Sequence, residues 1–82
     1  MNKEYVLYNL KEAKEELDRT IKEIETDSDY GYGEFFVAMA HLYHHINTAW
    51  NAQNEDMEVT IKCSQKDFDR WRIFPKDIQE LL

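Results

Sequence analysis

The chain has 82 residues, of which 43% are hydrophobic and 33% are charged, and its net charge is −7. A chain of this length forms one domain with a marginally stable core, and its composition is too apolar for a disordered protein. The acidic excess argues against nucleic-acid binding, because phosphates attract a basic face. Only two glycines and one proline occur, which favours long helices over a turn-rich β fold.

The compartment follows from three features of the sequence. Cys63 is the single cysteine, so one chain cannot form a disulfide, and this suits a reducing compartment. The apolar run Tyr5–Tyr8 is too short for a signal peptide. Three histidines and two asparagines make residues 35–52 a poor membrane span. We therefore expect a cytoplasmic protein without membrane contact.

Residues 3–26 have the pattern of an amphipathic helix. Apolar residues recur at alternating spacings of four and three, which places them on one stripe about 80° wide. This stripe consists of Val6, Leu10, Ala13, Leu17, Ile21 and Ile24. Charged residues surround it, so we expect the stripe to be the inner face of the helix. Residues 27–33 contain both glycines and predict the connecting loop.

Residues 34–53 predict a second long helix with an unusually wide apolar arc. On a helical projection the arc covers roughly 200°, about twice the width that a single neighbouring helix needs. It consists of Phe35, Phe36, Met39, Ala40, Leu42, Tyr43, Ile46, Ala49 and Trp50. The part of this arc that one neighbouring helix leaves uncovered predicts a homodimer, or else coverage by the C-terminal segment. We expect Phe36, Ala40, Tyr43 and Trp50 to make the contact.

The remainder of the chain predicts shorter elements. Residues 54–63 alternate apolar and polar side chains, and we expect an extended connection that lays Met57, Val59 and Ile61 on the bundle. Residues 64–74 predict a helix capped by Ser64, and Pro75 separates it from a short C-terminal turn at residues 75–82. The predicted fold is all-α, a single domain over residues 1–82 in which a long antiparallel helical hairpin precedes a shorter third helix.

Three histidines lie together on the polar side of the second long helix. His41 and His45 are four residues apart, a spacing that can chelate a divalent transition metal. His44 and Glu34 are further ligand candidates on that helix. The alternative is that the imidazoles lie on its wetter side or hydrogen-bond near an interface, because helical metal sites usually draw ligands from two elements.

Aromatic residues are the second cluster with functional potential. Phe36, Tyr43, Trp50 and Trp71 can pack in the core or form an interaction surface, and Asn47 lies at the edge of the apolar arc, where its amide needs a partner. No spacing typical of catalysis is present, so we expect no enzyme. The sequence favours a small non-enzymatic interaction or regulatory module that binds itself or a protein partner, with a metal-binding protein as the alternative.

Overall fold

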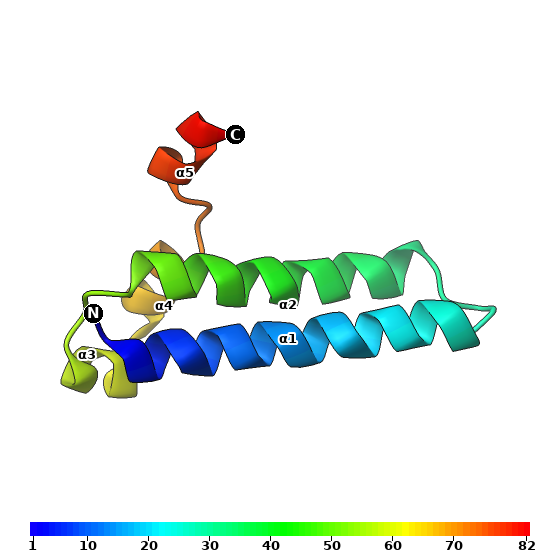
Figure 1. The fold of residues 1–82 in the computed structure, drawn as a ribbon, viewed down its shortest axis with the longest axis horizontal. Coiled ribbons are helices and arrows are strands. Elements are labelled where there is room, and N and C mark those ends of the chain that lie inside the picture. Colours follow the sequence, from blue (N-terminus) through cyan, green and yellow to red (C-terminus); the bar gives the residue numbers. More distant parts are fainter.

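A computed structural model describes all 82 residues and contains five helices and no strand. The long helices α1 (Lys3–Thr26) and α2 (Tyr32–Asn51) form an antiparallel hairpin, followed by α3 (Met57–Lys62), α4 (Gln65–Trp71) and α5 (Lys76–Leu81). Figure 1 shows α4 beside α2, α3 near the start of α1, and α5 projecting away from the hairpin. The predicted all-α hairpin with a short C-terminal helix is confirmed.

Side chains placed just before two of the helices cap their first turns, where backbone N–H groups lack helical partners. The Oδ1 atom of Asn2 accepts a hydrogen bond from the N–H of Tyr5 at 3.1 Å, at the start of α1. The hydroxyl of Ser64 accepts one from the N–H of Asp67 at 3.2 Å, at the start of α4. The predicted cap of the shorter helix is therefore confirmed.

The face of α1 that contacts α2 differs from the predicted one. Leu10, Leu17, Ile21 and Ile24 remain 45%, 45%, 48% and 51% exposed, so the apolar stripe is not the inner face. The face buried against α2 lies about 70° further round the helix, as its spacing along the sequence shows. Its buried residues are Asn9, Ala13, Glu16 and Thr20.

The opposing face of α2 explains why this polar contact forms. Ala38, Ala49 and Ala52 are all buried there, and their small side chains let the two backbones approach closely. Beside the alanines, His45 of α2 and Asn9 of α1 form a hydrogen bond across the contact, which offsets the cost of removing the two side chains from water. The hairpin is thus joined along its small and polar residues, and its large apolar side chains remain outside.

The segment expected to be extended is helical. α3 occupies residues 57–62, and Met57 and Ile61 are 51% and 77% exposed rather than laid on the bundle. A lone strand would leave its backbone groups unpaired, whereas a helix satisfies them internally. Thr60 is the buried residue of α3, and its hydroxyl lies 3.4 Å from the Nδ2 of Asn2. The N–H of Asn2 in turn donates to the carbonyl of Gln53 at 2.6 Å, which ties the chain start to the end of α2.

The molecule is elongated for its length. Its radius of gyration is 14.3 Å, compared with about 12 Å expected for a compact domain of this length. Its extents are 44 × 28 × 21 Å, and the hairpin lies along the longest of them. None of the helices combines the length and the apolar character needed to cross a lipid bilayer.

Candidate interaction surface

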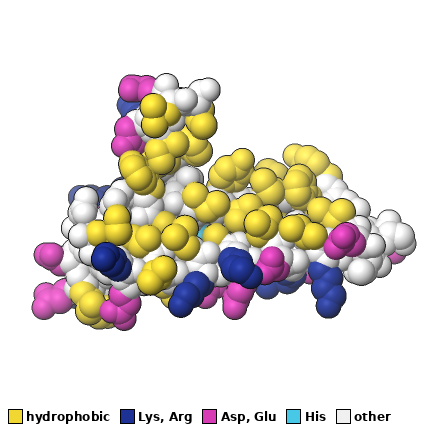
Figure 2. Space-filling model, in the orientation of Figure 1, with side chains coloured by type: hydrophobic (Ala, Val, Ile, Leu, Met, Phe, Trp, Pro, Cys, Tyr) yellow, Lys and Arg dark blue, Asp and Glu magenta, His cyan; other side chains and the backbone are white.

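The large apolar side chains of α1 and α2 lie on the same side of the hairpin and form one surface, which we call the apolar face. Figure 2 shows it as a continuous band of hydrophobic side chains over both helices, with the Lys, Arg, Asp and Glu side chains of this view mostly along the edge that α1 forms. Its exposed members are Leu10, Leu17, Ile21, Ile24, Phe35, Phe36, Tyr43, Ile46 and Trp50.

The part of α2 within the apolar face contains no charged residue. This part follows one side of the helix from Tyr32 to Trp50, and every side chain on it is apolar or aromatic. Monomeric proteins rarely expose so large a contiguous apolar patch, and such patches mark interaction sites. The face therefore has the composition of the core of a protein interface, where charged residues are depleted.

The five residues predicted to form an interaction surface separate into two groups. Phe36, Tyr43 and Trp50 are 62%, 50% and 42% exposed and belong to the apolar face. Asn47 and Trp71 are 5% and 1% exposed, so the structure places them inside the protein. Sequence reasoning identified the exposed aromatic residues but left out the stripe of α1, because a regular stripe normally faces the core of its own chain.

Asn47 has a structural role that its position at the edge of the arc did not reveal. Its Nδ2 donates a hydrogen bond to the carbonyl oxygen of Arg72 at 2.8 Å. One turn later, the Nδ2 of Asn51 donates to the carbonyl oxygens of Trp71 and Ile73, both at 2.7 Å. The last carbonyls of a helix have no partner within it. The two amides of α2 therefore satisfy the C-terminal end of α4 and hold it against the hairpin.

The candidate metal ligands do not converge. His41 Nδ1 lies 3.8 Å from Glu16 Oε1, whereas His45 Nδ1 lies 3.1 Å from Asn9 Oδ1. The carboxylate of Glu34 accepts a hydrogen bond from the backbone N–H at the start of α2. No three His, Cys, Asp or Glu side chains lie close enough together to hold one metal ion. His41 and His45 thus face side chains of α1 across the hairpin, whereas His44 lies beside Phe68 of α4.

Two of these histidines are partly withdrawn from water. Burial lowers the pKa of His44 and of His45 below the ordinary imidazole value, and each lies close to other groups that become positive on protonation. His44 Nδ1 lies 3.4 Å from the hydroxyl of Thr48, one turn further along α2. Both imidazoles are therefore held neutral near pH 7, as groups that contact α1 and α4 rather than as charges.

A small cavity lies where α1, α2 and α4 meet. Its volume is about 210 Å³, and the buried indole of Trp71 contributes to its wall. No protein atom accepts a hydrogen bond from the Nε1–H of this indole, and a cavity of this size has room for a water molecule that could accept it. The other lining residues are Tyr5, Tyr8, Asn9, His44, His45, Thr48, Cys63 and Phe68.

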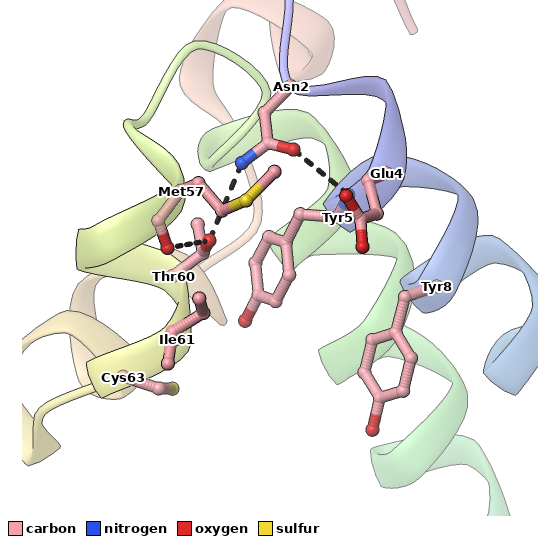
Figure 3. Close-up of a pocket in the computed structure, with 8 residues that line it drawn as sticks. All are labelled: Asn2, Glu4, Tyr5, Tyr8, Met57, Thr60, Ile61 and Cys63. Atoms are coloured by element: carbon pink, nitrogen blue, oxygen red, sulfur yellow. Dashed lines mark hydrogen bonds between the residues drawn. The ribbon is translucent and has the colours of Figure 1, made fainter.

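A second, more open cavity of about 430 Å³ lies between the start of α1 and α3. Figure 3 shows the rings of Tyr5 and Tyr8 on one side and Met57, Ile61 and Cys63 on the other. The two rings are nearly parallel, with centroids 6.2 Å apart. Burial raises the pKa of Tyr5, so its phenol stays protonated. The lining is mostly apolar, and the nearby thiol of Cys63 also contributes to the raised pKa of Tyr5.

The short helix α5 forms an arm beside the apolar face. The Nε1–H of Trp50 donates a hydrogen bond to the Asp77 carboxylate at 3.2 Å, which fixes the start of the arm at the C-terminal end of α2. Leu81 and Leu82, at its tip, are each 86% exposed. Figure 2 shows hydrophobic side chains on both sides of the notch that separates the arm from α2.

Comparison with other proteins gives no family assignment. No protein-family model, curated protein or solved structure matches this chain.

Proposed function

We propose that this protein is a small non-enzymatic interaction module that self-associates through its apolar face. The observation that carries the proposal is the continuous apolar surface formed by both long helices, which contains no charged residue on the side of α2. A monomer would leave these side chains in water, at a cost of about 25 cal/mol for each Å² of apolar surface. Covering the face is therefore the largest source of stability still open to the fold.

The surface area supports a partner of substantial size. The chain exposes 6418 Å², and a folded monomer of its mass, 9.9 kDa, is expected to expose about 5200 Å². The excess of about 1200 Å² is comparable to the 800 Å² or so that each partner buries in a standard protein interface. Part of this excess surface area comes from the elongated shape of the hairpin and from the projecting arm. Association would bury part of both surfaces.

The distribution of charge leaves the apolar face as the surface through which a second copy could bind. Two chains that each carry a net charge of −7 repel one another over most of their surfaces. An interface between identical copies therefore has to avoid charges, since every charge near the symmetry axis would meet its own copy. The apolar face meets this requirement. A reducing compartment such as the cytoplasm suits the exposed single cysteine, Cys63.

Sedimentation equilibrium over micromolar to sub-millimolar concentrations tests the proposal. We expect a dimer that strengthens as salt is raised, because salt screens the repulsion while the apolar contacts persist. Ile46→Glu places a charge within the apolar face and should yield monomers. Val37→Glu is the matched control, since Val37 is 53% exposed on another side of α2 and should leave the dimer intact.

Circular dichroism of each variant separates dissociation from unfolding. Ile46→Glu should keep the helical signal of the hairpin, because Ile46 is 44% exposed and lies outside the contact between the two long helices. A wild-type protein that stays monomeric at the highest concentration would overturn the proposal. Equal dissociation of both variants would place the interface elsewhere.

A further inference from the structure

Two apolar groups without a partner lie at opposite ends of the apolar face. At the C-terminal end of α2 the arm presents Leu81 and Leu82, each 86% exposed. At the N-terminal end of the same helix, Tyr32 and Phe36 are 83% and 62% exposed, and their rings lie 6.1 Å apart. All four of these side chains are large and apolar and lie mostly in water, and neither group reaches the other within one chain.

The structure fixes the separation between them. α2 has 20 residues and spans about 30 Å along its axis. The hydrogen bond between Trp50 and Asp77 anchors the arm at one end of that length. A helix of six residues is about 9 Å long, so the arm cannot fold back far enough to cover the aromatic pair of its own chain.

A second copy related by a two-fold axis can bring these groups together. When the axis is perpendicular to the hairpin, the two copies of α2 run antiparallel, and each arm lies beside the N-terminal end of the partner's α2. When the axis is parallel to the hairpin, arm meets arm and aromatic pair meets aromatic pair. In the antiparallel arrangement, the arm of one copy meets the aromatic pair of the other at each end of the dimer. The projecting arm then lies beside the flat face of the partner's α2 instead of meeting a second projecting arm.

We propose that two copies pair antiparallel and that their arms make reciprocal contacts. In this dimer, α5 of each copy covers Tyr32 and Phe36 of the other. This inference rests on the proposed self-association and specifies its geometry. The notch between arm and hairpin is then the groove that receives the partner's aromatic end. Residues 72–75 separate the arm from α4, and Pro75 directly precedes the first helical residue of α5.

Disulfide trapping between differently labelled chains tests the arrangement. In a Cys63→Ser background, one chain carries Leu81→Cys and the other carries Phe36→Cys, so a bond between the two can form only across the dimer. We expect this mixed disulfide to form at least about ten times faster than either disulfide between like chains. The matched control replaces Phe36→Cys with Val37→Cys, the adjacent residue on another side of α2, and should trap little product.

The outcomes separate the geometry from the association itself. A wild-type protein that sediments as a monomer would overturn both proposals. A dimer that forms only Leu81–Leu81 and Phe36–Phe36 disulfides would overturn the antiparallel arrangement and leave the proposed function standing. A dimer that traps none of these pairs would show that the arm lies outside the interface, which also overturns this arrangement.

A charge on the arm gives a second measurement that does not depend on disulfide chemistry. Leu81→Glu should weaken the dimer about tenfold or more, because it places an unpaired carboxylate against the partner's aromatic pair. Gln79→Glu adds the same charge to the same helix on a different side and should change the dissociation constant much less. Equal dissociation constants for the two variants would exclude a specific contact by the tip of the arm.

Discussion

His45 Nδ1 lies 3.1 Å from Asn9 Oδ1, and this pair joins the two long helices in the middle of a polar contact. The Nδ2 of Asn9 also donates a hydrogen bond to the carbonyl oxygen of Tyr5 at 3.0 Å, so the side-chain oxygen of Asn9 is left to accept a hydrogen bond from the imidazole. Asn9 is 2% exposed. This hydrogen bond fixes the position of α1 relative to α2 at one point, a role that interlocking apolar side chains have in most helical bundles.

Asn9→Ala should lower the free energy of unfolding by about 1–3 kcal/mol, because it leaves the half-buried imidazole of His45 without its hydrogen-bond partner. His45→Ala should cost a similar amount, and the double variant should cost less than the sum of the two. Urea unfolding of all four proteins measures this coupling, which we expect to be about 1 kcal/mol. Strictly additive losses would show that the pair contributes no interaction of its own.

Asn51→Asp should release α4 from the hairpin. The amide of Asn51 donates to the carbonyl oxygens of Trp71 and Ile73, and a carboxylate at this position can only repel them. The C-terminal end of a helix is also negative, so we expect a loss of about 2–4 kcal/mol. The fluorescence of Trp71 and the thermal midpoint report the change. Asn54→Asp, at an exposed position beyond α2, is the control and should leave both unchanged.

Acid should destabilise the protein below about pH 6.5. Burial lowers the pKa of His44 and His45 from the ordinary value of 6.5. Nearby His45, His41 and Arg72 also oppose the protonation of His44. For His45, the carboxylate of Glu12 favours protonation and nearby His41 opposes it, but burial is the larger effect. The unfolded chain therefore binds protons at a higher pH than the folded chain. The stability due to neutral imidazoles is complete above pH 6.5 and is lost as the pH falls through the lower folded-state pKa.

Unfolding midpoints in urea between about pH 7.5 and 5.5, at one fixed protein concentration, measure this dependence. Replacing both His44 and His45 with Gln should flatten the curve in this range, because glutamine does not titrate. A wild-type midpoint that rises as the pH falls would contradict the assignment of lowered pKa values.

Cys63→Gly should stabilise the protein by about 0.5–1 kcal/mol. Cys63 ends α3 in the left-handed conformation, with φ of 41° and ψ of 65°, and no other residue of the chain has a positive φ. Glycine adopts this conformation without strain, while a β-branched residue does not. Thermal unfolding should therefore rank the glycine variant above the wild type and Cys63→Val below it. A glycine variant that is less stable than the wild type would mean that packing of the thiol outweighs the backbone strain.

The fold class was predictable because it depends on local features. Long runs without Gly or Pro, Ser64 before the last predicted helix, and Pro75 after it each act within a few residues. The alternating residues of 57–62 were misinterpreted as extended, because six residues contain too little periodicity to separate a short helix from a strand.

The sequence alone determined that two long helices form, and that one of them carries more apolar surface than a single neighbour can cover. Only the tertiary structure decided which sides of the helices meet. The buried residues Ala13, Ala38, Ala49 and Ala52 allow close approach, and Asn9 with His45 supplies a hydrogen bond across the contact. The periodicity of a sequence cannot predict such a contact, because Asn9 and His45 are 36 positions apart in the chain. The stripe of α1 therefore faces outward and enlarges the surface of α2, rather than covering it.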